Sequence, residues 1–181
     1  MVLMNKKSDG FTIVELLMVI VVIGILAAIS VVAYNGVAAK ARDSQRAQDI
    51  KTIAKALEVY YIDNGRYPLS TGSTSINNSW SASADASWAN LAAQLKPYIG
   101  ELPVDPTNNG SGIGSTNYGY GYYSNPNTTA ASTNFCSASG DYQFYILTYN
   151  REGSGLTRET SGTCVGSGLG NSYQDYYRAV R

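Results

Sequence analysis

The residue with the clearest chemical meaning is Glu15, a carboxylate that directly precedes an apolar run over residues 16–34. Ser30 is the only plainly polar residue in that run, and the run is close to the about 20 residues that a helix needs to cross a bilayer. A carboxylate at the membrane centre costs roughly 2.5–3.5 kcal/mol. The position of Glu15 therefore predicts that this carboxylate has a function and a cationic partner. A helix that only anchored the chain would need neither.

Cleavage of the chain could create that partner. The nearest cations, Lys6 and Lys7, lie on the far side of Gly10. Cleavage after Gly10 would give Phe11 a free α-amine at the apolar end of the helix. Because residues four apart share a helix face, we expect Glu15 to pair with such an amine, on its own chain or on a neighbour.

The segment K-K-x-x-G-F-T-I-V-E-L-L, which starts at Lys6, resembles the leader and mature start of type IV pilins and type II secretion pseudopilins. The resemblance covers residues 6 to about 68. It implies that a prepilin peptidase cuts after Gly10 and methylates the new N-terminal Phe11. It also implies that Glu15 neutralises the Phe11 amine of a neighbouring subunit during assembly.

The family's fold is α+β: a long N-terminal helix, apolar in its first half, packs in its second half against a small antiparallel sheet. The resemblance implies a cleaved leader at 1–10, a transmembrane and filament-core helix at 11–36, its amphipathic half at 37–64, and a head at 65–181 with an αβ-loop at 69–101 and the sheet and C-terminal region at 102–181.

By the same resemblance, the protein is a structural subunit that polymerises through its N-terminal helix into an extracellular filament for motility, adhesion or DNA uptake. Its partners would be copies of itself, the prepilin peptidase, an inner-membrane assembly platform and the membrane. It would be a single-pass cytoplasmic membrane protein before assembly. The alternatives are a pseudopilin of a secretion or competence system, and a membrane-anchored surface adhesion domain.

An ordinary secretory signal is a further alternative for the N-terminus, because Ala39-Lys40-Ala41 fits the small-x-small cleavage rule. The apolar run is longer than the usual 7–15 residues of such signals, and Glu15 precedes it directly. Both features favour the pilin interpretation.

Composition narrows the function classes. Lys+Arg and Asp+Glu are both 13, so the formal charge is zero, and bulk charge gives no support for nucleic-acid binding. The chain has no histidine, which removes the usual general base and the commonest metal ligand. We expect neither an enzyme nor a cofactor.

Cys136 and Cys164 indicate one disulfide in an exported protein, with two buried thiols as the alternative.

Periodicity predicts one helix from Phe11 to about Asp63, since no proline interrupts residues 11–67. An apolar stripe at helical spacing should face the head: Ile50, Ile53, Ala54, Leu57 and Tyr61. The charged residues from Arg42 to Glu58, with Arg46 and Asp49 among them, are expected mostly off this stripe. The stop is expected at Asn64-Gly65. The following G-x-Y-P resembles the family's helix exit.

In the head, residues 69–87 read as a loop, 88–95 as a short helix, 102–106 (L-P-x-D-P) as a rigid turn capped by Asp105, and 118–123 and 142–149 as strands. A return strand is expected at 156–160, which gives a sheet of three or four antiparallel strands. The tail at 173–180 is expected to be either a strand or a short helix. Side-chain oxygens for calcium are present, but not at an EF-hand spacing, which favours turn chemistry over metal binding: Asp105, Asn108, Asn109, Asp141 and Asp175.

Overall fold

The computed structural model describes residues 10–72, 80–110, 116–124, 143–153, 160–163 and 175–180. The chain divides into two compact units, one that ends at Ala39 and one that begins at Lys40. Each unit is described by itself.

Helix α1 spans Ile13–Asn64, which confirms the single long helix predicted from the sequence. Its end is set by Gly65, whose φ of 69° lies in the left-handed region. The Gly65 amide donates to the carbonyl oxygen of Tyr61 at 2.7 Å and closes the last turn. The predicted stop at Asn64-Gly65 is confirmed.

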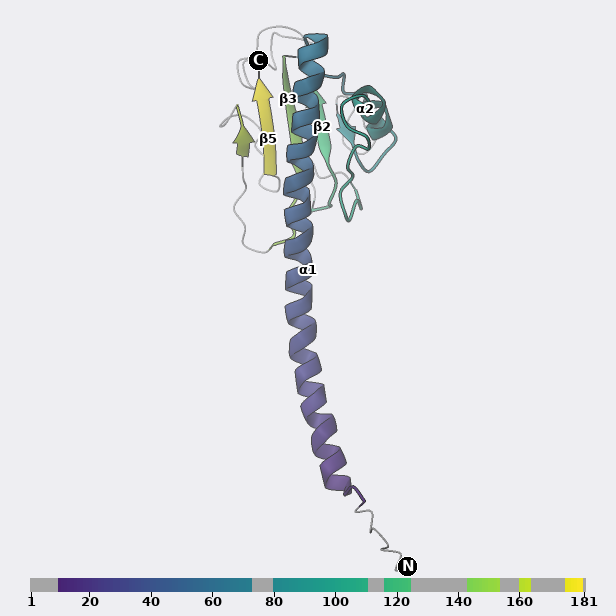
Figure 1. Cartoon of the computed structure of the whole chain (residues 1–181), viewed down its shortest axis with the longest axis vertical. Helices are drawn as coiled ribbons and strands as arrows, with labels where there is room; N and C mark the ends of the chain where they lie inside the picture. The colour runs from purple at the N-terminus through teal and green to yellow at the C-terminus, as the bar shows by residue number, and fades with distance from the viewer. Residues whose placement is uncertain are drawn as a thin grey trace, which may run out of the picture. The chain divides into compact units, whose positions relative to one another are not determined.

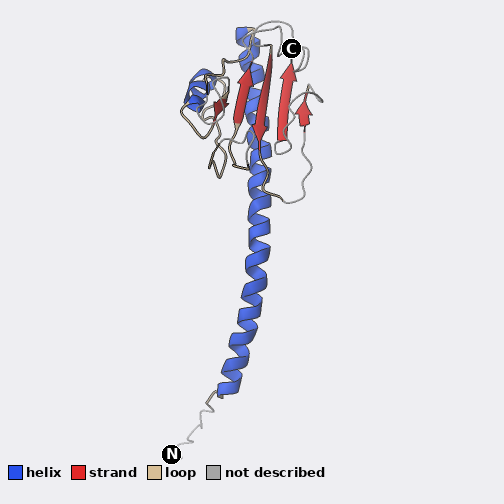
Figure 2. Cartoon of the chain, turned by 180° about the vertical axis from the view of Figure 1, so that it is seen from behind, coloured by secondary structure: helices blue, strands red, loops and turns tan. Residues whose placement is uncertain are grey.

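The sheet has five strands in the order β1-β2-β3-β5-β4 (Figures 1 and 2). The strands are β1 Ser81–Ala82, β2 Gly121–Ser124, β3 Phe144–Tyr149, β4 Thr160–Gly162 and β5 Asp175–Val180. All neighbouring pairs are antiparallel except β4 and β5, which are parallel. The α+β class and the small, mainly antiparallel sheet are confirmed.

Three details of the head differ from the sequence prediction. The stretch 69–87 is not a loop throughout, because β1 lies in it and pairs with β2. Of the predicted return strand at 156–160, only Thr160 is described; it belongs to β4, which pairs with β5 and not with β3. The tail is a strand, β5, and it is β3's second neighbour. A two-residue strand such as β1 and a three-residue strand such as β4 are too short to show a periodicity in the sequence.

The core of the second unit lies between the α1 stripe and one face of the sheet. Ile53 and Leu57 are fully buried, and Tyr61 packs against the cluster. The sheet contributes alternate residues of β3, namely Tyr145, Leu147 and Tyr149, together with Tyr120 and Tyr122. Helix α2, Ser87–Leu95, adds its own apolar face: Trp88, Leu91 and Leu95. The predicted stripe and the predicted short helix are confirmed.

The predicted aromatic strand begins later than expected, at Gly121, and carries aromatic side chains on both faces. Tyr122 belongs to the core cluster. Tyr123 contacts Trp80 and Phe144 instead, at ring-centroid distances of 5.1 and 6.0 Å. The Tyr-Gly alternation therefore describes one face of the strand, and Tyr123 supplies the other.

A buried ionic cluster ties α1 to the turn at 102–106. Arg46 is fully buried and pairs with Asp105, Asp43 and Glu152. Asp105 Oδ1 also accepts the backbone amides of Thr107 at 2.8 Å and Asn108 at 3.2 Å, which confirms the capped turn. The prediction that Arg46 lies off the buried stripe is wrong. Arg46 precedes Ile50 by one helical turn and is buried on the same face of α1. Asp49 is buried too, and accepts the hydroxyl of Tyr120.

Candidate functional site

The N-terminal site begins with a short segment outside the helix. Gly10, Phe11 and Thr12 precede α1 and have no helical assignment. Phe11 is 88% exposed, and a Cβ added at Gly10 would meet no atom within 4 Å. The peptide bond between Gly10 and Phe11 therefore lies outside the helix and is exposed.

Thr12 and Glu15 form a reciprocal pair at the start of α1. Glu15 Oε2 accepts the Thr12 backbone amide at 2.9 Å and the Thr12 hydroxyl at 2.7 Å. In return, Thr12 Oγ1 accepts the Glu15 amide at 3.2 Å. This is a capping box, in which the residue before the helix and the third helical residue satisfy each other's amides. It fixes where α1 begins and where the carboxylate lies.

The capping box was missed from the sequence, although T-x-x-E before an apolar run is its usual signature. It gives Glu15 a role within its own chain, in addition to the pairing with an amine that the sequence predicts. Both bonds from Thr12 reach the same carboxylate oxygen, Oε2. Oε1 accepts no hydrogen bond within the described residues, so it is available to a further donor.

The apolar part of α1 has the properties of a membrane span. An 18-residue window reaches a mean hydropathy of 3.1, with none of it buried inside the protein. The hydroxyl of Ser30, the polar residue of the run, donates a hydrogen bond to the Leu26 carbonyl oxygen at 2.8 Å. Its hydrogen-bond donor is therefore satisfied within the helix. The large apolar side chains whose exposure is described between Ile13 and Val37 are about half exposed or more. This surface has to be covered by lipid or by other chains.

The remaining sequence candidates are in the head. Cys136, Cys164 and Asp141 lie outside the described residues. Asp175 pairs with Arg151 at 2.7 Å, and Asp105 pairs with Arg46 at 2.8 Å. Across the described ranges no three metal-binding side chains come together. Of these candidates, Asp105 acts in a turn and in an ion pair, and Asp175 acts in an ion pair.

Two family matches cover most of the chain. Residues 5–31 match the prokaryotic N-terminal methylation motif. Residues 33–133 match the family described as type II secretion system (T2SS), protein G. The first match contains the capping box and most of the apolar run. The second contains the amphipathic part of α1, α2 and the turn at 102–106.

Relatives of two kinds are similar to the chain. Type II secretion system core protein G of Aeromonas hydrophila is 33% identical over 107 residues, which cover 58% of this chain and 71% of the relative. Core protein G of Escherichia coli is 35% identical over 108 residues, which cover 58% of this chain and 70% of that protein. Type IV major pilin protein PilE1 of Neisseria gonorrhoeae is 37% identical over 65 residues, which cover 36% of this chain and 39% of that protein. No solved structure matches significantly.

Proposed function

Because the chain belongs to the protein G family of the type II secretion system, within the pilins and pseudopilins, we propose that it is a processed subunit of a helical filament. The family is structural. Its members begin as membrane-anchored precursors, and the apolar half of α1 fits that state. The observation that carries the proposal is a capped apolar helix directly after an exposed Gly10–Phe11 bond.

Processing is the first step that we propose. A prepilin peptidase cuts after Gly10, and the amine of Phe11 is methylated. Cleavage removes the residues before Phe11 and leaves Thr12 and Glu15 untouched. The capping box therefore survives processing and holds the carboxylate close to the new cation.

Assembly is the second step. Glu15 uses Oε2 for its own helix cap and Oε1 for the Phe11 amine of a neighbouring subunit. A carboxylate has about four acceptor sites on its two oxygens, so the cap and the pair are compatible. A buried ion pair is better attested as a source of specificity than of net stability. The pair would accordingly set the register between copies, while packing against other copies keeps the apolar run out of water once it leaves the membrane.

A T2SS pseudopilin is the second candidate, favoured by the protein G match over residues 33–133. Its filament would be short and would stay within the cell envelope, whereas a pilus would extend from the cell. Shearing intact cells distinguishes them, because only long external fibres are released. We propose an inner-membrane assembly platform as a partner in both cases, and no enzymatic activity.

The mass of the mature N-terminal peptide tests the proposed processing. The protein is isolated from membranes of cells with and without the prepilin peptidase. With the enzyme we expect the chain to start at a methylated Phe11; without it, residues 1–10 should remain. A chain that keeps residues 1–10 in peptidase-positive cells would contradict the proposal.

A further inference from the structure

Asparagine followed by glycine occurs at three places in the chain, namely Asn35–Gly36, Asn64–Gly65 and Asn109–Gly110. In such a pair, the backbone nitrogen of the glycine can attack the side-chain amide carbon of the asparagine. Both groups belong to adjacent residues, so the attack is intramolecular and needs no enzyme. Glycine has no side chain that would shield its nitrogen or restrict its backbone. Each pair is therefore a candidate site of spontaneous deamidation.

The reaction balances without a cofactor. The glycine nitrogen loses its proton and bonds to Cγ of the asparagine, the Cγ–Nδ2 bond breaks, and Nδ2 leaves as ammonia. Water then opens the resulting succinimide ring at either carbonyl, which gives aspartate or isoaspartate. The sum consumes water and releases ammonia, with no oxidant or reductant. In a folded chain, the reaction needs a glycine N–H that is not engaged and an amide carbon that can reach it.

The pair Asn35–Gly36 is protected because it lies inside α1. In the helix, the Gly36 amide donates to the carbonyl oxygen four residues earlier. That bond and the helical backbone would have to open before the glycine nitrogen could turn towards Asn35. We therefore expect little reaction at this pair.

The pair Asn64–Gly65 is held by three hydrogen bonds at the end of α1. The Gly65 amide, which would be the nucleophile, donates to the Tyr61 carbonyl oxygen at 2.7 Å. Asn64 Nδ2, which would be the leaving group, donates to the Tyr60 carbonyl oxygen at 2.9 Å and to the Tyr98 hydroxyl at 3.1 Å. The side-chain amide is thereby held back along the helix.

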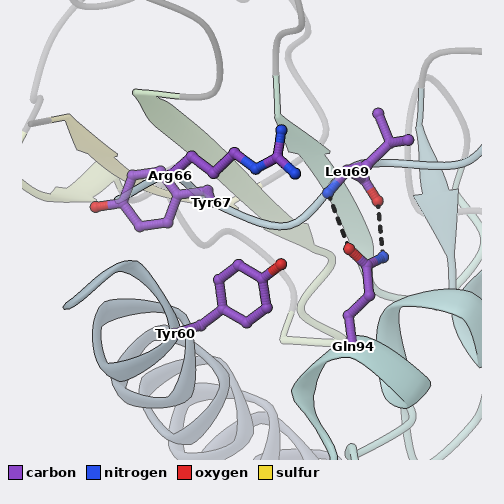
Figure 3. Close-up of a pocket in the computed structure, with 5 residues that line it drawn as sticks. All are labelled: Tyr60, Arg66, Tyr67, Leu69 and Gln94. Carbon is purple, nitrogen blue, oxygen red and sulfur yellow. Dashed lines mark hydrogen bonds between the residues drawn. The ribbon is translucent and has the colours of Figure 1, made fainter. Parts of the chain in front are cut away.

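The chain beyond Gly65 is fixed as well. The Gly65 carbonyl oxygen accepts the side-chain amide of Gln143 at 3.2 Å. Figure 3 shows the two hydrogen bonds between the Leu69 backbone and the Gln94 side chain, each 3.2 Å long. Ring closure at Asn64 would have to rotate a backbone that is bonded on both sides of the linkage.

The pair Asn109–Gly110 lies outside the helices and strands, and Asn109 is exposed. Asn109 Oδ1 accepts the Tyr118 amide at 2.7 Å, while the Asn109 amide donates to the Tyr118 carbonyl oxygen at 3.0 Å. Oδ1 is the atom that becomes negative when Gly110 attacks, and a backbone N–H aimed at it stabilises that charge, as in an oxyanion hole. Within the described residues, neither the Gly110 amide nor Asn109 Nδ2 makes a hydrogen bond. Nucleophile and leaving group are therefore both available.

We infer that Asn109 is the residue at which the folded head is deamidated, with water as the co-reactant, while Asn35 and Asn64 keep their amides. The dipeptide is the same at all three positions, so the local structure sets the difference. The hydrogen bond to the Asn109 side chain assists the reaction, whereas those at Asn64 oppose it. The inference does not depend on the proposed function.

The two products should differ in their effect on the head. An aspartate at position 109 keeps an oxygen acceptor for the Tyr118 amide. An isoaspartate lengthens the main chain by one carbon beside Gly110, where space is tight: a Cβ added at Gly119 would lie 2.2 Å from the Gly110 carbonyl oxygen. We expect the longer main chain to displace Tyr118, whose ring centroid lies 4.7 Å from Cζ of Arg46.

Ageing of the full-length chain in detergent micelles tests the inference. The protein is kept in mildly alkaline buffer, digested at intervals and analysed by mass spectrometry with fragmentation that separates aspartyl from isoaspartyl products. We expect at least about tenfold more conversion at Asn109 than at Asn64 or Asn35, because hydrogen bonds have to open before either of these can react. The isolated proteolytic peptides should convert at similar rates. Asn109→Gln is the matched control and should lose only the reaction at position 109.

Conversion at Asn64 or Asn35 that equals or exceeds that at Asn109 overturns the inference. So does an Asn109 that stays intact in the folded chain while its isolated peptide converts, or an equal preference for Asn109 among the isolated peptides. Thermal unfolding tests the consequence: the aged wild type should melt below fresh Asn109→Asp, and aged Asn109→Gln should melt like the fresh variant. Equal melting of the aged wild type and Asn109→Asp would refute the effect of the longer main chain.

Discussion

Arg46 and Asp105 form a two-point ion pair in which neither side chain is exposed. Arg46 Nε lies 2.8 Å from Asp105 Oδ2, and Nη2 lies 3.1 Å from Oδ1. The guanidinium also lies 4.7 Å from the ring centroid of Tyr118. This pair joins α1 to the turn at 102–106, so it fixes the helix within the head.

Arg46→Leu is the first prediction. It removes the cation and leaves Asp43, Asp105 and Glu152 close together without it. Breaking a buried pair from one side typically costs about 3–5 kcal/mol, so we expect a loss of that size in the free energy of unfolding, measured by denaturant titration. Lys51→Leu is the control, since Lys51 is exposed and should change stability by less than about 0.5 kcal/mol. A loss no larger for Arg46→Leu than for Lys51→Leu would contradict the assigned role.

The second prediction concerns pH. Hydrogen bonds from Arg42, and then from Arg46, lower the pKa of Glu152 from 4.5 to about 2. A lowered carboxyl pKa adds stability that is complete above the unfolded value and is lost as the pH falls towards the folded value. We therefore expect thermal stability of the wild type to fall between about pH 4.5 and 2. The Glu152→Gln variant should lose less across that window, and parallel curves for the two proteins would argue against the pairing.

The third prediction is the Cys136–Cys164 disulfide. The end of β2 pairs with the start of β3, and β4 and β5 also finish at this end of the sheet. β2, which precedes Cys136 in the chain, and β4, which precedes Cys164, therefore both finish at the same end of the sheet. Alkylation of the denatured, unreduced protein should modify no thiol, and the mass should rise by two alkyl groups after reduction. Two modified thiols before reduction would refute the disulfide.

The fourth prediction separates the helix cap from the rest of the site. Thr12→Val keeps the size of the side chain but removes its hydroxyl, which should destabilise the start of α1 by about 0.5–2 kcal/mol. Thr12→Ser should retain the cap. Hydrogen exchange at residues 13–16, measured in detergent micelles, should be faster in Thr12→Val only. Equal exchange rates in both variants would show that the capping box does not hold the helix start.

The features that could be predicted from the sequence are those encoded by nearby residues. The K-K-x-x-G-F-T-I-V-E motif, the stripe through Ile53 and Leu57, and the stop at Gly65 each depend on local spacing. The burial of Arg46 could not be predicted, because its partners Asp105 and Glu152 are distant in sequence. The parallel pairing of β4 with β5 could not be predicted either, because the three residues of β4 are too few to show a strand period. The capping box was local and could have been found.

The substitution Glu15→Gln tests the central claim most directly, because glutamine can keep the capping box but cannot neutralise an amine. The variant should be inserted and cut after Gly10 like the wild type, as verified by the mass of its N-terminal peptide. We predict that it forms few or no filaments, as Glu15→Ala should. Wild-type filament yields from processed Glu15→Gln would contradict the claim that Glu15 acts through its charge, and would leave it only a role in capping the helix.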